Sequence, residues 1–318
     1  MTVAFIGDLQ RGMAGVAGGK GACLNDMVCD GFPVPEGYII CANVFRDFIE
    51  QNGLSAQIAD LIRKIRIDNA EELEHCSHAI RQLITGADIP EGLREKIVGP
   101  YRVFCGSEED LPVAVRSSST AEDLPEASFA GQQETFLYVI DEEEVVSRVK
   151  ECWASIYNAR AIFYRQQKGF GSGDVDIAVV IQRMIDAEKA GVMFTLNPIT
   201  KDEGSTVIEA VWGLGEGAVS GRVTPDSYIV RKDTLELKQE FISVKEVMVV
   251  RSNSKRGVQE KSVSLDQMEK RVLSSQEMRT LVEYGNKLEK CFGAPQDIEW
   301  AIEKGRFYLL QSRPVTCV

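Results

Sequence analysis

Two oxygen-bearing side chains near the end of the chain interrupt strands that are otherwise apolar. The segment from Asp297 to Gln311 has the pattern of two strands around a turn that contains Gly305. Glu299 and Gln311 lie in these strands, although the interior of a sheet normally excludes such groups. A carboxylate and an amide oxygen on adjacent strands suit Mg²⁺, which takes one or two protein ligands together with phosphate oxygens. Arg313 follows Gln311 by two residues and shares its face. The alternative is an exposed edge hairpin with solvated polar groups.

The register of this hairpin decides whether Glu299 and Gln311 can bind one ion. Side chains alternate between the two faces along each strand, and directly paired residues lie on the same face. Glu299 and Gln311 therefore share a face only if the numbers of two directly paired residues add up to an even number. A two-residue turn at Lys304-Gly305 would place them on opposite faces. Because a three-residue loop ends on a left-handed residue, which glycine suits, we predict a three- or five-residue connection. Glu299, Gln311 and Arg313 would then face the same side, whereas a two-residue turn without a compensating bulge would contradict a shared magnesium site.

A second candidate is a short apolar strand that ends on a cation. Leu111-Pro-Val-Ala-Val-Arg116 leads into the run Ser117-Ser-Ser-Thr120. An arginine delivered into four hydroxyl groups is typical of anion recognition, because the guanidinium group offers a fork of donors. The same stretch fits a helix start, since Ser119 and Glu122 have the spacing of a capping box. Both interpretations can hold together.

A third candidate is the glycine-rich segment Gly18-Gly-Lys20-Gly. It lacks the spacing of a Walker loop. A flexible loop of this composition could still bring backbone N–H groups close to a phosphate, with Lys20 as a point charge. A plain glycine turn at the surface is equally compatible with the pattern.

Two other groups of residues give weaker signals. Gly213-Leu-Gly-Glu-Gly217 follows a strand, but no acid stands where a dinucleotide-binding fold needs one. His75 and His78 are the only histidines, and their spacing could place both on one helix face. Two ligands do not complete a metal site, which favours a solvated helix face.

The elements that would position these groups follow from periodicity. Helical spacing extends from residue 44 to about 95, with breaks at Gly53, Gly86 and Pro90, and one amphipathic helix is predicted over residues 143–168. A continuously apolar centre predicts a buried strand over residues 176–184. Later in the chain we predict strands at 192–195, 206–212, 228–231 and across 235–250, an exposed loop at 251–261, and a helix at 276–291. Helices in the first half and strands in the second indicate two unlike α/β lobes with a cleft between them.

Composition narrows the class of protein. The 318 residues include 44% hydrophobic and 26% charged ones, as in globular proteins of about two domains. A net charge of −12 argues against a general nucleic-acid-binding protein, which needs a basic face. The chain has neither the apolar stretch of a membrane span nor the start of a signal peptide. Its eight cysteines are scattered without a Cys-x-x-Cys pair, so we expect reduced thiols and a cytoplasmic location.

Taken in order, these motifs resemble those of one family closely. The family comprises phosphoenolpyruvate synthase, pyruvate phosphate dikinase and rifampin phosphotransferase, and the likeness is to its N-terminal ATP-binding domain. The motifs cover nearly the whole chain and are Gly18-Gly-Lys-Gly, Val115-Arg-Ser-Ser-Ser-Thr-Ala-Glu-Asp-Leu-Pro-Glu-Ala-Ser-Phe-Ala-Gly-Gln-Gln-Glu-Thr135, Val180-Ile-Gln-Arg-Met184, Trp212-Gly-Leu-Gly-Glu216, and Asp297-Ile-Glu-Trp300 with Leu310-Gln-Ser-Arg-Pro314.

The resemblance implies an α/β ATP-grasp fold with mixed or antiparallel sheets and ATP between two lobes, residues 1–182 and 183–318. It also assigns site residues. The cations that contact phosphate and act in catalysis match Lys20, Arg116 and Arg313. Gly131 and Thr135 match the phosphate loop, and Gln182 and Met184 match the positions beside the adenine. Glu209 is a weaker match near the ribose, and Glu299 and Gln311 match the magnesium ligands.

One part of the family pattern is missing. Family enzymes pass phosphate to a histidine on a separate swivelling domain, and from there to pyruvate or another acceptor. Neither His75 nor His78 stands in a context that resembles that carrier, and the sequence stops at Val318. We therefore expect an ATP-dependent phosphotransferase module that needs a carrier domain in cis or in trans. The alternatives are the ATP-binding half of a rifampin-phosphotransferase-like or other dikinase, and a non-catalytic nucleotide-binding module. Retention of the cations and of both metal ligands favours the first hypothesis.

Overall fold

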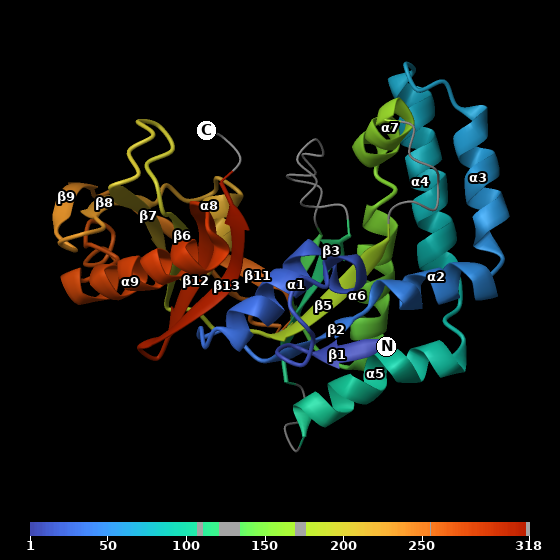
Figure 1. The fold of residues 1–318 in the computed structure, drawn as a ribbon, viewed down its shortest axis with the longest axis horizontal. Coiled ribbons are helices and arrows are strands. Elements are labelled where there is room, and N and C mark those ends of the chain that lie inside the picture. The colour runs from blue at the N-terminus through green and yellow to red at the C-terminus, as the bar shows by residue number, and fades with distance from the viewer. Residues whose placement is uncertain (107–110, 121–133, 169–175, 255, 316–318) are drawn as a thin grey trace. The chain divides into compact units, whose positions relative to one another are not determined.

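A computed structural model describes residues 1–106, 111–120, 134–168, 176–254 and 256–315 (Figure 1). The chain divides into two compact units. Unit 1 contains Met1–Asn25 and Glu36–Met184, and unit 2 contains Asp26–Pro35 and the chain from Ile185 onward. The short segment Asp26–Pro35 belongs to unit 2 because Phe32 lies against the ring of Tyr284 and Pro33 accepts a hydrogen bond from the Leu309 N–H.

Unit 1 is built on a five-stranded antiparallel sheet of order β1-β2-β5-β3-β4. Its strands are β1 (Val3–Phe5), β2 (Gly37–Ile40), β3 (Val113–Ser119), β4 (Thr135–Val139) and β5 (Ile177–Arg183). The central strands β3 and β5 are buried along almost their whole length, as the apolar run of β5 predicts.

Helices cover one face of this sheet. They include α2 (Ala42–Gln51), α3 (Leu54–Lys64), α4 (Ala70–Gly86), α5 (Glu91–Cys105), α6 (Glu142–Ser155) and α7 (Ala159–Lys168). Figure 1 shows α6 and α7 one after the other alongside α4. Trp153 of α6 is fully buried against the rings of Phe45 and Phe48, with ring centroids 5.9 and 4.9 Å away. The apolar side chains of β3 and β5 complete this core.

The helical pattern between residues 44 and 95 is confirmed, including its breaks. Gly53 adopts a left-handed conformation before α3, α4 ends at Gly86, and Pro90 precedes α5. The single helix predicted over residues 143–168 is wrong. The first helix, α6, ends at Ser155. The side chain of Asn158 then caps a second helix, α7, by accepting a hydrogen bond from the Ala161 N–H at 2.7 Å.

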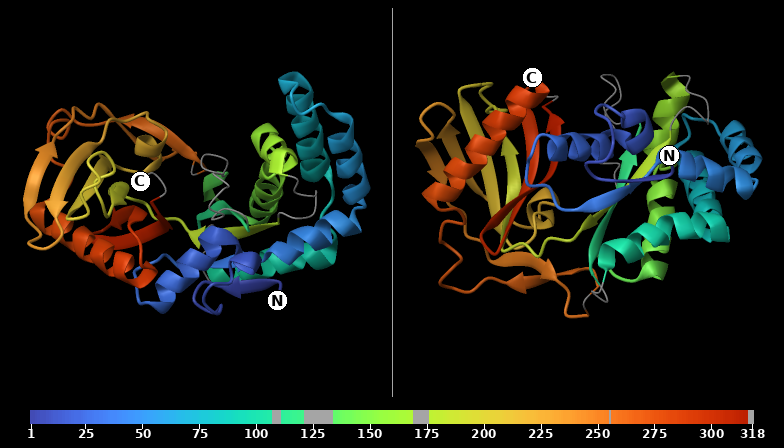
Figure 2. Two further views of the ribbon diagram at one scale, coloured as in Figure 1. Left: turned by 45° about the horizontal axis from the view of Figure 1, so that its top comes forward. Right: turned by 60° about the horizontal axis from the view of Figure 1, so that its bottom comes forward.

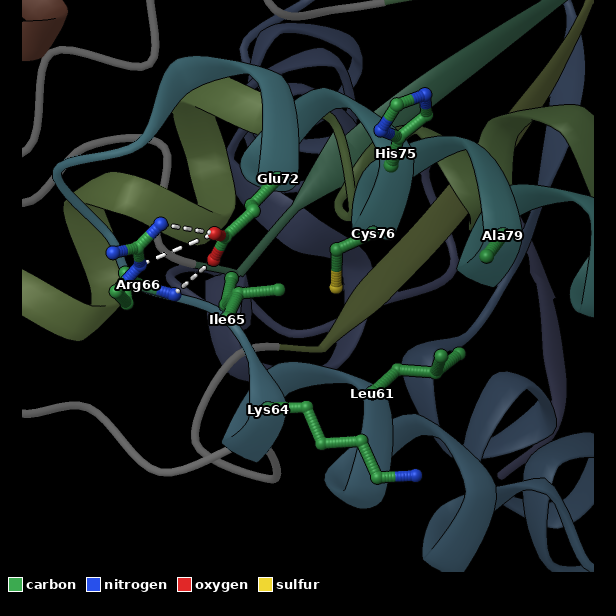
Figure 3. A pocket seen from close by; sticks show the side chains of 8 residues that line it. All are labelled: Leu61, Lys64, Ile65, Arg66, Glu72, His75, Cys76 and Ala79. Carbon is green, nitrogen blue, oxygen red and sulfur yellow. Dashed lines mark hydrogen bonds and ion pairs between the residues drawn. The ribbon is translucent and has the colours of Figure 1, made fainter.

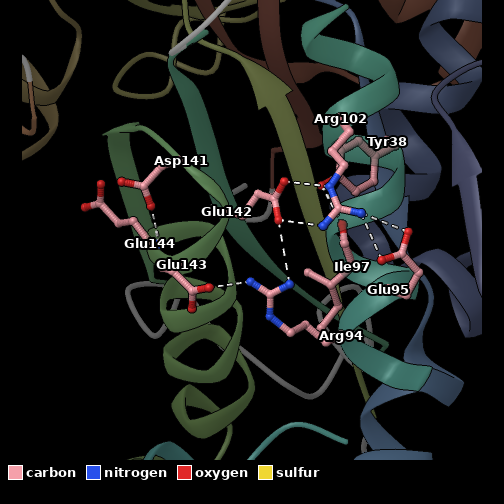
Figure 4. Close-up of polar contacts among 9 residues, drawn as sticks. All are labelled: Tyr38, Arg94, Glu95, Ile97, Arg102, Asp141, Glu142, Glu143 and Glu144. Atoms are coloured by element: carbon pink, nitrogen blue, oxygen red, sulfur yellow. Dashed lines mark hydrogen bonds and ion pairs between the residues drawn. The ribbon is translucent and has the colours of Figure 1, made fainter. Parts of the chain in front are cut away.

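An ion-pair network joins α5 to the first turn of α6 (Figure 4). Arg102 donates to both carboxylate oxygens of Glu142 at 2.6 and 2.8 Å and to Glu95 at 3.0 and 2.9 Å. Arg94 adds contacts to Glu142 and Glu143. The hydrogen bonds from Arg102 hold the pKa of Glu142 below its usual value.

Replacing Arg102 by methionine should therefore lower stability in a pH-dependent way. The folded-state pKa of Glu142 lies below its unfolded value of about 4.3, so the stabilisation is present above that pH and is lost as the pH falls through the folded pKa. Unfolding curves of the wild type and the Arg102→Met variant should differ near pH 7 and converge in acid. High salt should also bring them together, because these groups are largely exposed. A difference that persisted in acid would assign the effect to packing of the arginine stem.

Unit 2 is built on a six-stranded antiparallel sheet of order β13-β12-β6-β7-β8-β9. Its strands are β6 (Lys189–Phe194), β7 (Ser205–Trp212), β8 (Asp226–Arg231), β9 (Leu237–Phe241), β12 (Gln296–Glu303) and β13 (Arg306–Pro314). A short helix α8 (Glu216–Val219) follows β7, and the long helix α9 (Ser275–Phe292) lies along one face of the sheet (Figures 1 and 2). A capping box of Ser274 and Glu277 starts α9, and left-handed Gly293 ends it.

The strands predicted for this unit are confirmed with small changes in their ends. The exposed loop predicted over residues 251–261 is wrong, because Val258–Ser262 forms β11 and pairs with β10 (Val247–Arg251) in a separate two-stranded sheet. Val258–Ser262 has one apolar residue followed by polar and charged ones, a composition typical of an exposed loop, so the sequence gives no sign of this strand.

A buried ion pair ties β8 to two later segments of unit 2. Lys245 donates to the carboxylate of Asp226 at 2.5 Å, and both side chains are fully buried. Asp226 also accepts hydrogen bonds from the Tyr228 hydroxyl at 2.8 Å and from the Ser243 and Val272 N–H groups at 3.0 and 2.9 Å. Each charge is thus compensated by several partners, which a buried ion pair requires.

The described helices include none that is both long and apolar enough to cross a membrane.

Candidate functional site

In unit 1 the glycine-rich segment is helical, in contrast to the flexible loop that we predicted. It lies in α1 (Ala14–Cys29), which is kinked at Gly18, where φ is 68° and ψ is 170°. Lys20 follows the kink, is 4% exposed, and donates from Nζ to the backbone oxygen of Ser117 at 3.1 Å. The lysine therefore lies against β3, the strand that also carries Arg116.

Strand register places three predicted residues on one face of the unit 1 sheet. Arg116 of β3 is paired directly with Thr135 of β4, and Ala114 of β3 is paired with Gln182 of β5. Directly paired residues and residues two apart share a face, so Arg116, Thr135 and Gln182 lie on the same side. Arg116 and Gln182 are buried. Ser118, which contacts α1, lies on this side too, so the structure brings the four groups to the face that α1 covers.

Two other predicted positions contribute less. Met184 follows β5, is half-buried, and donates its N–H to the backbone oxygen of Pro112 at 3.0 Å. Gly131 of the predicted phosphate loop and Glu122 of the predicted capping box lie outside the described residues.

In unit 2 the terminal hairpin has a two-residue turn, so the predicted three- or five-residue connection is wrong. Glu303 is paired with Arg306 across Lys304 and Gly305, whose φ angles of 51° and 73° are those of a type I′ turn. A lysine can take the left-handed conformation that we reserved for the glycine, and the turn is therefore one residue shorter.

A β-bulge restores the arrangement that the short turn would have destroyed. Trp300 is paired with Leu309, whereas Glu299 is paired with Gln311, so Leu310 is the extra residue of β13. Leu310 packs against a small apolar cluster of Ile185, Ala190 and Ala301. Glu299 and Gln311 consequently stand directly opposite each other on one face of the sheet.

The same cross-strand row continues through the sheet. Glu299 is paired with Val192 of β6, and Val192 with Glu209 of β7. The apolar residues of the opposite face, such as Met193, pack against α9, so Glu209, Glu299 and Gln311 share the face away from that helix. Gln311 is buried, and the two glutamates are half-buried.

Asp297 is a further acidic residue of this face that the sequence reasoning did not single out. It is paired with Arg313 and accepts hydrogen bonds from the guanidinium group at 2.8 and 2.7 Å. Burial raises the pKa of Asp297, and Arg313 opposes that shift. Burial also raises the pKa of Glu209, and the negative charge of Asp297 raises it further. The available signal was its position two residues before Glu299, which places both carboxylates on one face.

The donor set on this face fits a hard cation with few protein ligands. Directly paired residues have side chains within about 5 Å of each other. Among the described residues no group of three histidine, cysteine or acidic side chains could hold a metal ion. Glu299 and Gln311 could provide two oxygen ligands and leave the other positions to phosphate and water, as Mg²⁺ prefers.

A separate pocket of about 510 Å³ lies between α3 and α4 of unit 1 (Figure 3). Leu61, Ile65 and Cys76 line it, together with the ion pair of Arg66 and Glu72. His75 lies at its edge, and His78 is an exposed residue of the same helix. Among the described residues, none of those predicted to bind nucleotide lines this pocket.

Comparison with known proteins places the chain in a family. The model of the pyruvate phosphate dikinase AMP/ATP-binding domain matches residues 14–318. The chain is 46% identical to a probable phosphoenolpyruvate synthase of Methanocaldococcus jannaschii, over 99% of this chain and 26% of the relative. It is 44% identical to a probable phosphoenolpyruvate synthase of Methanothermobacter thermautotrophicus, over 99% of this chain and 46% of the relative. It is 40% identical to the phosphoenolpyruvate synthase of Pyrococcus furiosus, over 97% of this chain and 43% of the relative.

The chain thus spans between about a quarter and a half of the length of these relatives. Both the family model and the relatives cover nearly all of its residues, including every segment described above as a candidate site. The chain belongs to the pyruvate phosphate dikinase AMP/ATP-binding domain family.

Proposed function

We propose that this chain is the ATP-binding phosphotransferase module of a phosphoenolpyruvate synthase-like enzyme, which passes phosphate from MgATP to a carrier histidine on another domain and ultimately to pyruvate. The family membership supports ATP as the ligand. The observation that carries the phosphotransferase proposal is the direct pairing of Glu299 with Gln311, two residues from Arg313. A module that bound only adenosine would have no use for a metal site beside a cation.

Each unit would contribute one set of groups within an ATP-grasp fold. Lys20, Arg116 and Thr135 of unit 1 would bind the phosphates, and Gln182 and Met184 would contact the adenine. In unit 2, Glu209 would bind the ribose and Arg313 a phosphate, while Glu299 and Gln311 would hold Mg²⁺. The ion, when bound, would neutralise charge on the phosphate oxygens. The cations would stabilise the charge that develops during transfer.

Binding and transfer can be tested separately. Calorimetry should detect MgATP binding, and Lys20→Ala should weaken it by about 10- to 100-fold, the value of a charge-assisted hydrogen bond. Adenosine affinity should stay unchanged. Lys150→Ala is a matched control, because Lys150 also lies in unit 1 and donates to a backbone oxygen, that of Ala87, at 3.1 Å. Equal losses for ATP and adenosine would point to misfolding instead of phosphate recognition.

The transfer step needs a carrier domain taken from a longer relative. Alone, the chain should turn MgATP over slowly, because in-line transfer needs a positioned nucleophile. With the carrier and ATP labelled at the β-phosphate, phosphohistidine should form on the carrier. Tight MgATP binding without any transfer would favour a non-catalytic nucleotide-binding module.

A further inference from the structure

The kink in α1 is produced by a side chain from another element. In an uninterrupted helix the Gly21 N–H would donate to the Ala17 carbonyl, four residues earlier. Here the Gly21 N–H donates to the hydroxyl oxygen of Ser118 at 3.0 Å, and the same hydroxyl donates to the Ala17 carbonyl at 2.8 Å. The Ser118 hydroxyl is therefore inserted into the hydrogen-bond ladder of α1, which is a recognised cause of sharp kinks.

Gly18 makes this insertion sterically feasible. Its φ of 68° is unfavourable for residues with a side chain. A Cβ atom at position 18 would also lie 2.1 Å from the backbone oxygen of Ser118 and 2.2 Å from its hydroxyl oxygen. The two segments meet without room for one more carbon, and Ser118 is fully buried.

Lys20 lies inside the turn that Ser118 opens. The backbone N–H of its neighbour Gly21 donates to the Ser118 hydroxyl. The ammonium group of Lys20 itself donates to the Ser117 carbonyl at 3.1 Å. The side chain of Lys20 and the backbone next to it are thus both held by hydrogen bonds to β3, the strand that also carries Arg116. The position of one predicted phosphate-binding cation relative to the other depends on this contact.

We propose that Ser118 is a positioning residue, which opens the α1 ladder and thereby sets Lys20 beside Arg116 for phosphate binding. This inference rests on the proposed function, since it assigns Ser118 a role in the binding of ATP. Ser118 would not touch the nucleotide itself. It would act through Lys20.

The test is a double-mutant cycle read by calorimetry. Ser118→Ala should weaken MgATP binding by about tenfold while adenosine affinity is unchanged, because part of one charge-assisted contact is lost. On a Lys20→Ala background the same change should cost less than about twofold, since the two residues act as one unit. Ser155→Ala is the matched control, as Ser155 is a buried serine of unit 1 whose hydroxyl donates to the Cys152 carbonyl at 2.7 Å. It should leave MgATP affinity unchanged.

Ser118→Cys is the second variant, and unchanged adenosine affinity would show that each variant is folded. The thiol is larger than the hydroxyl and is a weaker donor and acceptor, so Ser118→Cys should also bind MgATP less tightly than the wild type. Additive losses in the cycle, or wild-type affinity in both Ser118 variants, would overturn the positioning role. Wild-type protein that binds no MgATP would instead overturn the proposed function. In that case faster hydrogen exchange of the Gly21 amide in Ser118→Ala would still report the structural contact.

Discussion

Replacing Glu299 by alanine should slow phosphate transfer from MgATP to the carrier histidine by about 10³-fold. Glu299 is the only charged member of the proposed ligand pair, and its removal would leave Gln311 to hold the ion with a neutral oxygen. Gln311→Ala should have a smaller effect, of about tenfold, because an amide oxygen is the weaker ligand. Adenosine affinity should be the same in both variants.

Mn²⁺ gives a readout of this site that does not depend on transfer. In the wild type, Mn²⁺ and ATP together should form a ternary complex that enhances the relaxation of water protons. Glu299→Ala should reduce that enhancement strongly. Glu236→Ala serves as the control, because it removes an exposed carboxylate at the distant turn between β8 and β9. A Glu299→Ala protein with normal Mn²⁺ enhancement would show that the ion is held elsewhere.

Replacing Lys245 by methionine should lower the free energy of unfolding of unit 2 by about 3–5 kcal/mol. The change would leave the carboxylate of Asp226 fully buried without its countercharge, although the Tyr228 hydroxyl and two backbone N–H groups would still donate to it. The double variant Lys245→Met with Asp226→Asn should be more stable than Lys245→Met alone, because it buries no uncompensated charge.

Urea unfolding followed by tryptophan fluorescence can measure this loss. Two of the three tryptophans, Trp212 and Trp300, belong to unit 2 and report mainly on it. Lys238→Met is the control, because its ion pair with Asp202 is half-exposed and should contribute little. A loss below about 1 kcal/mol in Lys245→Met would mean that water reaches Asp226 once the lysine is removed.

The candidate residues of the terminal hairpin were easier to identify from the sequence than the register that brings them together. Glu299 and Gln311 stood out as polar residues in apolar strands, and their shared face is confirmed. Their register was not predictable, because a type I′ turn at Lys304 and a bulge at Leu310 cancel each other's effect. Neither has a strong local signal, since lysine seldom takes a left-handed conformation and the bulge residue is an ordinary leucine.

Contacts between distant segments explain the other differences. The glycine-rich segment before Lys20 has a loop-like composition, but it forms a helix whose kink depends on Ser118. The ion pair of Asp226 and Lys245 was invisible for the same reason, because two charged residues far apart in the chain normally indicate two solvated positions. Gln182 and Thr135 were proposed as site residues only through resemblance to a family.

The bulged hairpin limits how this part of the chain can change in length. One extra residue between Glu299 and Gln311, or one fewer, would turn the carboxylate and the amide to opposite sides of the sheet, whatever side chain was gained or lost. Two residues added or removed together would leave them facing each other. Substitutions at Leu310 should therefore be tolerated far better than its deletion, and insertions viable in this hairpin should come in pairs. Between these two positions, selection would act on the number of residues more strictly than on their identity.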